Sequence, residues 1–201
     1  MADEQEWSGQ TYVDEDWYGR DLGSAAYRDC TFRDVDLTES QSRGATFEAC
    51  TFHNCRFNAS HHTETAFVAC SFRRTSFFGA TLEGCKLTGS SFVDCTLRPL
   101  TVRGGQWRAV VLRGAKLGGL DLSGLLLSEA DLSDADLTAA VLARADLTRA
   151  TLRGAELAQA DLRAARLDAA DLQHARLRET RLDLDGAIML AEAHGAVVGD
   201  G

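Results

Sequence analysis

The sequence predicts an all-β fold in which one short unit repeats along a solenoid, and three observations lead to this prediction. An apolar residue recurs at every fifth position from Leu22 to Leu182, a small residue lies two positions before it, and the register never slips. Only Ser42 and His62 interrupt the apolar series, and from Leu117 onward the central residue is always leucine. A period this strict over most of the chain indicates a repeat architecture.

A period of five residues excludes the two common regular structures. An α-helix turns about 100° per residue, so five steps drift about 140° away from the starting face. A flat strand alternates faces, so an odd step places the next apolar residue on the opposite side. Within one unit, however, the small residue and the apolar residue share a strand face. We therefore expect a short strand and a turn in each unit, with coils stacked roughly 4.7–4.9 Å apart.

Columns of like residues favour a coil of twenty residues. Glycines recur at spacings that are multiples of twenty, at Gly44, Gly84, Gly104 and Gly124, and cysteines recur at Cys30, Cys50 and Cys70. Central positions without a large apolar side chain fall in one further column, at Ser42, His62 and Val102. The first half uses phenylalanine centres beside small polar residues, and the second half uses leucine beside alanine. Such large–small alternation fills a narrow interior. Around Pro99 and Trp107 the small position varies between glycine and leucine, which predicts local repacking with a bend.

We divide the chain into three parts. Residues 1–19 form an acidic N-terminal cap, because the open edge of a solenoid must be covered and this segment is rich in aromatic residues. Residues 20–184 form the repeat body. Residues 185–201 form a C-terminal helical cap, because aspartates precede an apolar stretch that ends before Gly195. The apolar stretch is either a lid on the last coil or a dimer contact through Ile188, Met189, Leu190 and Ala191.

Composition and charge exclude several classes of protein. The chain has 201 residues, a net charge of −9 and no apolar run long enough to span a bilayer. The acidic start lacks the features of a signal peptide, so we expect a cytoplasmic protein with reduced cysteines. Residues 1–19 hold six acidic and no basic residues, whereas residues 20–185 are nearly neutral. We expect no direct binding to nucleic acid and none to a membrane.

No constellation in the sequence supports catalysis. All six cysteines occupy the inward small position, where stacked thiols point in parallel and cannot converge on zinc. The segment His61-His62-Thr63-Glu64 is either a metal or acid–base site or an irregular coil, and the repeat register favours the irregular coil. Nucleotide-binding and hydrolase motifs do not occur. We therefore expect no catalytic residue, no cofactor and no metal.

One stretch of the repeat body is acidic without any base. It lies between Lys116 and Arg144, and we call it the acidic band; its members are Asp121, Glu129, Asp131, Asp134 and Asp136. The aspartates that precede central leucines are expected to bond backbone groups at the corners. The band is either a solvated surface or a partner-binding surface.

The repeated unit resembles that of the pentapeptide-repeat proteins. That resemblance implies a right-handed quadrilateral β-helix with four units per coil, and hence about eight coils over residues 20–184. Segments outside the generic repeat resemble the Qnr/MfpA-type members, which interact with gyrase and confer fluoroquinolone resistance; these segments are residues 37–44, 92–101 and 191–195.

The narrower resemblance implies a function. It implies a homodimer, joined at the C-terminal end, that mimics duplex DNA and binds DNA gyrase, inhibiting it and/or protecting it from fluoroquinolones or a natural toxin. Glu129, Asp134 and Asp136 stand where such a relative also has acids, and Asp121 stands where it has asparagine. The alternative is a non-catalytic scaffold for a different protein partner, because fold does not determine function.

Overall fold

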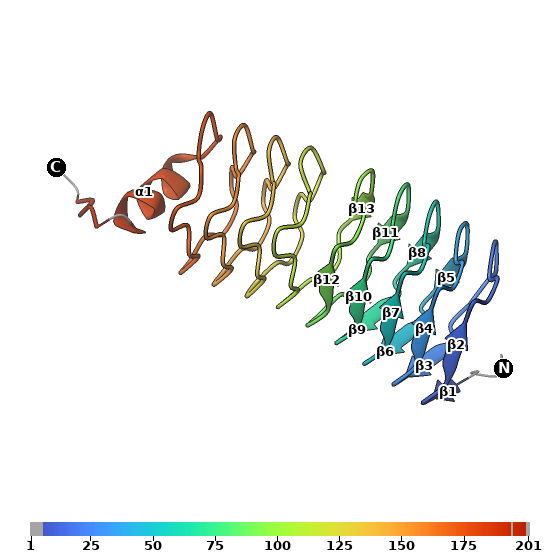
Figure 1. Ribbon diagram of the computed structural model, residues 1–201. Helices are drawn as coiled ribbons and strands as arrows, with labels where there is room; N and C mark the ends of the chain where they lie inside the picture. The colour runs from blue at the N-terminus through green and yellow to red at the C-terminus, as the bar shows by residue number, and fades with distance from the viewer. Residues whose placement is uncertain (1–5, 194, 200–201) are drawn as a thin grey trace.

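The computed structural model describes residues 6–193 and 195–199, and in it the chain winds as a β-solenoid (Figure 1). Every pairing is parallel and joins residues twenty positions apart, from Glu6↔Ala26 to Asp161↔Arg181. The predicted coil of twenty residues is therefore confirmed. Each coil has four faces, numbered 1 to 4 by the residues that begin them in the first coil: Glu6, Thr11, Asp16 and Asp21.

Three of the four faces carry strands of three residues each. Face 1 contains β1 (Glu6–Ser8), β3 (Ala26–Arg28), β6 (Thr46–Glu48) and β9 (Ala66–Val68). Face 2 contains β2 (Thr11–Val13), β4 (Thr31–Arg33), β7 (Thr51–His53), β10 (Ser71–Arg73) and β12 (Ser91–Val93). Face 4 contains β5 (Gln41–Arg43), β8 (His61–Thr63), β11 (Thr81–Glu83) and β13 (Thr101–Arg103).

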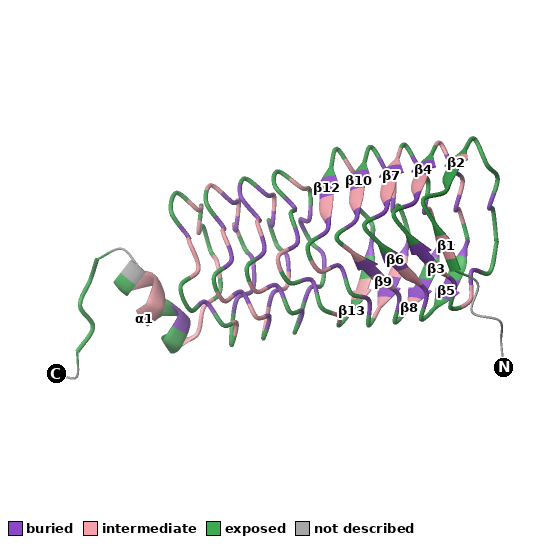
Figure 2. Ribbon diagram, turned by 90° about the horizontal axis from the view of Figure 1, so that it is seen from below, coloured by how far each residue is buried: buried purple, intermediate pink, exposed green. Residues whose placement is uncertain are grey.

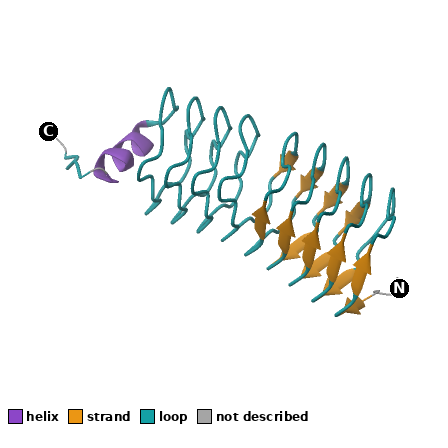
Figure 3. Cartoon of the chain, in the orientation of Figure 1, coloured by secondary structure: helices purple, strands orange, loops and turns teal. Residues whose placement is uncertain are grey.

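Isolated bridges continue the ladder where strands are not formed. Face 3 is joined by bridges such as Asp16↔Asp36, and from residue 106 onward all four faces of the described chain are joined to the following coil in this way (Figure 3). There each corner is closed by a β-turn, as where the N–H of Ala130 donates to the carbonyl of Leu127 at 3.0 Å. The leucine and alanine half therefore keeps the coil register with shorter extended segments.

The predicted inward residues are buried, and buried positions recur along each coil (Figure 2). In the first half, aromatic rings stack from coil to coil, with centroids 4.8 Å apart for Tyr27 and Phe47 and 4.6 Å apart for Phe32 and Phe52. In the second half the central leucines are buried from Leu117 to Leu172, and the alanines two positions before them are buried from Ala130 to Ala160. The repeat period thus identifies the core, because one large and one small side chain per unit fill the narrow interior.

The corner after each face requires a left-handed backbone. Residues at positions ending in 4 or 9 have positive φ almost throughout, and many are Asp, Asn or Gly, which tolerate this conformation. Pro99 stands at one such corner, but its ring fixes φ near −65° and it has no N–H to donate. The Arg98–Pro99 peptide bond is cis.

The ladder is interrupted at this proline. On face 3, bridges join residues 76 and 96 and residues 116 and 136, but within the described chain none joins residues 96 and 116. On face 4, β11 pairs with β13 and Asp121 pairs with Val141, but among the described residues no bridge joins residues 101 and 121. Face 1 remains joined by the bridges that Gln106 forms with residues 86 and 126. The coils consequently separate on one side, and Figure 1 shows a wider space after the coil that contains β12 and β13.

The segment expected to be an N-terminal cap is the first coil from residue 6 onward. β1 pairs with β3 and β2 pairs with β4, so the repeat begins at Glu6 and not at residue 20. Trp7 takes the central position and stacks on Tyr27 at 4.8 Å. Aromatic residues in this segment therefore extend the core. Residues 1–5 lie outside the described chain.

The C-terminal helix α1 (Leu184–Ala193) follows the last coil. Asp183 caps it, because its Oδ1 accepts from the N–H of Gly186 at 2.9 Å, and its Oδ2 accepts from the N–H of Ala164 at 2.6 Å. One carboxylate thus begins the helix and ties it to the preceding coil. No helix in the described chain has the length and apolar character needed to cross a bilayer.

The two polar residues in the apolar series form a buried network. His62 Nδ1 lies 2.6 Å from Ser42 Oγ, and its Nε2 lies 3.1 Å from Ser60 Oγ. The Ser42 hydroxyl also lies 2.7 Å from Thr65 Oγ1. Burial lowers the pKa of His62 to about 3. The imidazole is therefore neutral in the folded protein at physiological pH, in a coil that keeps the regular register.

This network predicts an acid sensitivity that a His62→Leu variant should lack. Between pH 6.5 and about 3 the unfolded state binds a proton at His62 that the folded state excludes, so stability falls as pH falls through this window. From pH 7 to pH 5 the loss due to His62 is expected to be about 2 kcal/mol. Urea unfolding at both pH values measures it. Equal losses in His62→Leu and the parent would contradict the assignment.

Candidate partner-binding surface

Outward side chains form columns along each face, one residue per coil. The aspartate before a central leucine stabilises the corner of the coil, because its Oδ1 accepts a hydrogen bond from the N–H of the residue two positions later. This bond measures 3.0 Å for Asp121, Asp131 and Asp136. Hydrogen bonds from Ser123 lower the pKa of Asp121, and those from Thr138 lower the pKa of Asp136. The expected bonding to corner backbone is confirmed, and these carboxylates are ionised.

The acidic band encircles the solenoid and does not lie on one face. Asp121 begins a unit on face 4, Asp131 one on face 2 and Asp136 one on face 3. Glu129 and Asp134 occupy the left-handed corners that follow faces 1 and 2. A flat partner could therefore contact only part of the band at once, chiefly the three aspartates around the edge between faces 2 and 3.

Arginines neutralise part of the band. Arg108 lies 2.7 Å from Glu129, and Arg113 lies 3.3 Å from Asp131. Asp121 and Asp134 have no ion-pair partner within residues 6–193 and 195–199. The free charge of the band is consequently smaller than the sequence suggests, and Asp134 is its most available carboxylate toward faces 2 and 3.

The same pairing of neighbouring coils occurs along the whole rod. Arg56 lies 2.8 Å from Asp36 and lowers the pKa of that carboxyl to about 2. The other pairs between neighbouring coils include Arg28 with Glu6 and Glu48, Arg103 with Glu83, Arg153 with Asp171, Arg166 with Asp146, and Arg176 with Glu156. Exposed pairs contribute little stability each, but they do reduce the negative charge that a partner meets.

The strongest acidic surface lies on the first two coils. Residues 6–45 contain nine Asp and Glu but four Arg, whereas residues 46–185 contain 17 acidic and 17 basic residues. Asp14 and Asp34 share the corner column after face 2, and Asp16 and Asp36 share a column on face 3. This surface is not predicted from the sequence when residues 1–19 are assigned to a separate cap. The spacing of twenty between the two acidic pairs was the signal that could have found it.

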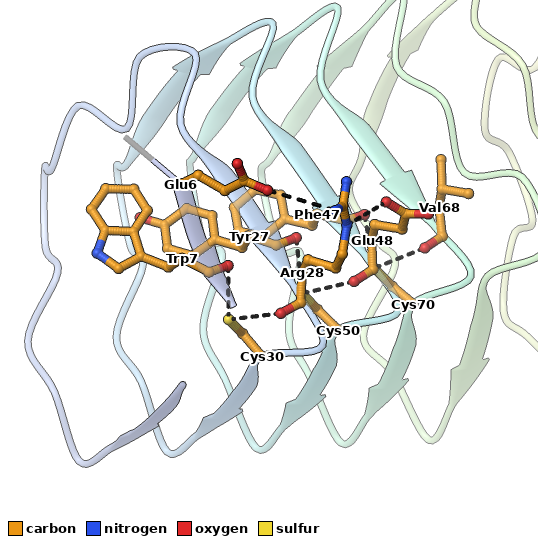
Figure 4. A network of polar contacts seen from close by, with 10 residues as sticks. All are labelled: Glu6, Trp7, Tyr27, Arg28, Cys30, Phe47, Glu48, Cys50, Val68 and Cys70. Carbon is orange, nitrogen blue, oxygen red and sulfur yellow. Dashed lines mark hydrogen bonds and ion pairs between the residues drawn. The ribbon is translucent and has the colours of Figure 1, made fainter. Parts of the chain in front are cut away.

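The cysteines form inward columns, of which Figure 4 shows the one formed by Cys30, Cys50 and Cys70. Each thiol contacts carbonyl oxygens of its own and the preceding coil, as Cys50 Sγ contacts the carbonyl of Tyr27 at 3.4 Å. Burial raises the pKa values of Cys55, Cys85 and Cys95 to about 11, which keeps these thiols protonated.

The histidine segment does not gather ligands. His61 faces outward, 3.9 Å from Glu83, while the imidazole of His62 is buried. Within the described residues no three His, Cys, Asp or Glu side chains are placed to hold one metal ion. The two neighbouring histidines therefore point to opposite sides of the coil wall.

At the C-terminal end, α1 is partly buried. Met189 and Leu190 pack against the core, and Ile188 and Ala191 are half-buried. Leu184 is 76% exposed, and Val197 beyond the helix is 97% exposed. The helix covers the last coil and still leaves apolar side chains in contact with solvent.

Comparison with known proteins agrees with this architecture. A family model described as "Pentapeptide repeat region" matches residues 45–132, and a second, "Pentapeptide repeats (8 copies)", matches residues 145–183. Together they span more than half of the chain. This chain belongs to the pentapeptide-repeat family. No curated protein matched the sequence of this pentapeptide-repeat protein.

Solved structures show the same fold. A trypsin-treated form of QnrB1, a plasmid-mediated fluoroquinolone resistance protein, superposes with a TM-score of 0.84 at 18% identity, over 96% of this chain and 97% of QnrB1. A second trypsin-treated form gives 0.75 at 17% identity, with the same coverage. Similarity at this level of identity establishes the fold of this pentapeptide-repeat protein and leaves its function to be proposed.

Proposed function

We propose that this protein binds DNA gyrase as a mimic of duplex DNA, inhibiting the enzyme and/or protecting it from fluoroquinolones or a natural gyrase toxin. The observation that carries the proposal is the full-length similarity to QnrB1, which is described as a fluoroquinolone resistance protein. The resemblance of residues 37–44, 92–101 and 191–195 to Qnr/MfpA-type proteins supports the same function.

Charge and shape support DNA mimicry. The regular stack presents side chains at strand spacing along a rod, and a protein that binds DNA attracts rows of negative charge. Asp14, Asp34, Asp94 and Asp134 share the corner column between faces 2 and 3, which also contains Asn54, Arg74 and His174. In the described chain none of these four aspartates has an arginine or lysine within ion-pair distance. We propose this column, with the acidic band, as the surface that replaces phosphates. This function does not require the protein itself to bind nucleic acid.

A supercoiling assay tests the proposal. Purified DNA gyrase is titrated with this protein, with and without a fluoroquinolone, beside an unrelated acidic protein of equal charge. We expect inhibition of supercoiling, or rescue from the drug, at concentrations where the unrelated protein has no effect. Absence of both effects would favour the alternative function, a scaffold for a different protein partner.

We also propose that two copies join through α1 and the residues after it. The exposed apolar residues Leu184 and Val197 flank the predicted contact residues in the sequence. An end-to-end dimer would double the length of the rod. Ile188→Glu is expected to convert the dimer to a monomer, because it places a charge in an apolar contact. Ala187→Glu, on an exposed position of the same helix, should leave the dimer intact. Sedimentation at several protein concentrations distinguishes them, and a dimeric Ile188→Glu would contradict the assignment.

A further inference from the structure

The interruption at Pro99 leaves a cleft in the side of the solenoid. The cleft lies between residues 92–99 of one coil and residues 111–116 of the next, and its volume is about 1030 Å³. Small-molecule and cofactor sites commonly have about 300–1,000 Å³. This opening is therefore large enough to admit a ligand and is not a packing defect.

Unpaired backbone groups border the cleft on both sides. In neighbouring coils the N–H of Phe77 donates to the carbonyl of Thr96 at 2.8 Å, and that of Asp136 donates to the carbonyl of Ala115 at 2.9 Å. Between residues 95–98 and 115–118, all of them described, no backbone hydrogen bond is formed. Each side therefore presents the free polar edge that an added strand pairs with.

The cleft reaches the inner layer of side chains. Cys95 and Ala115 occupy inward small positions, yet both are half-buried, whereas Cys55, Cys85 and Ala135 in closed coils are buried. The buried central residue Leu97 also lines the opening. A segment that entered could place a small residue and an apolar residue against this layer.

The rim of the cleft is basic. Arg98, Arg113 and Lys116 line it, against one acidic residue, Asp94. The carboxylates that already face these cations, Asp131 beside Arg113 and Asp136 beside Arg98 and Lys116, belong to the coil beyond the cleft. The outward carboxylate of an occupant would meet Arg98 on one side of the cleft and Arg113 and Lys116 on the other.

We propose that this cleft binds an extended acidic peptide by β-strand addition. Its backbone pairs with the free groups of residues 95–98 and 115–118, and its small and leucine side chains face Cys95 and Leu97. Its carboxylate faces Arg98 and Lys116. The chain itself uses this pattern at residues 135–137, where Asp136 forms the bridge with Lys116 from the other side of the same coil. The inference does not depend on gyrase binding.

Cys95 supplies the readout for a test on the intact protein, because it is the one cysteine of the six that is not fully buried. Its alkylation by N-ethylmaleimide is followed by mass spectrometry with two probes, acetyl-Thr-Ala-Asp-Leu-Thr-Gly-amide and the peptide with lysine in place of aspartate. At four times its dissociation constant the acidic peptide should slow alkylation about fivefold. The lysine peptide should have no effect at the same concentration.

Two variants complete the test. Pro99→Gly restores an N–H and permits positive φ, as Gly79 and Gly119 do in the same column, so it should close the cleft and protect Cys95 without any peptide. Arg98→Gln keeps the cleft open and should weaken protection by the acidic peptide. Equal protection by both peptides, protection by neither at millimolar concentration, or acidic-peptide protection that Arg98→Gln leaves unchanged would overturn the proposal.

Discussion

Replacing Leu127 by aspartate is expected to destabilise the protein by more than about 4 kcal/mol, because it buries an unpaired charge and removes a core side chain. Leu127 is 1% exposed and occupies a central position. The same replacement at Leu126, which is 45% exposed on the outward position beside it, is expected to change stability by less than about 0.5 kcal/mol.

The two substitutions form a matched pair, since they change the same side chain in adjacent residues of one coil. Urea denaturation followed by circular dichroism gives both free energies of unfolding. If the two variants unfolded at similar urea concentrations, residue 127 would not face the interior, and the repeat register would be wrong in this coil.

Neutralising the acidic band is expected to have the largest effect on function. The triple variant Asp131→Asn, Asp134→Asn and Asp136→Asn should weaken displacement of duplex DNA from gyrase about tenfold or more, because the proposed contact depends on charge. Asparagine keeps the acceptor oxygen that bonds the corner N–H and tolerates the left-handed corner at residue 134. The fold should therefore persist.

The control neutralises three aspartates that also bond corner backbone but lie beyond the band: Asp146, Asp161 and Asp171. It matches the first variant in net charge and in the type of substitution. The band variant should lose displacement, and the control should keep it. Equal loss in both would indicate a general charge effect, and loss in neither would remove the band from the mechanism.

The strict period of five predicted the fold in detail, because it determines which side chains of each unit face the interior of the narrow solenoid. His62 illustrates how firmly the register holds, since a histidine at a central position is still buried and the coil around it keeps its strands. The stacked thiols of Cys30 and Cys50 likewise follow from their shared column. Helix α1 was predictable from its capping aspartate and apolar run.

Features that depend on contacts between coils were not predictable in the same way. The sequence shows which acidic residues make up the band, but the winding of the chain decides how they are distributed over the four faces. Arg113, which neutralises Asp131, is 18 residues away from it in the sequence. Pro99 indicated a local interruption of the regular coils. The size of the cleft, however, depends on where the backbone hydrogen bonds between the two coils form again. The first coil was missed because strands β1 and β2 pair with residues beyond the assumed boundary.

We propose that this rod occupies the site of duplex DNA on gyrase, and displacement of a fluorescently labelled duplex from purified gyrase measures that occupancy. The unsubstituted protein should displace the duplex in a saturable manner, with the affinity falling as salt rises. Binding to gyrase that leaves the duplex in place, or no binding by a correctly folded protein, would contradict it.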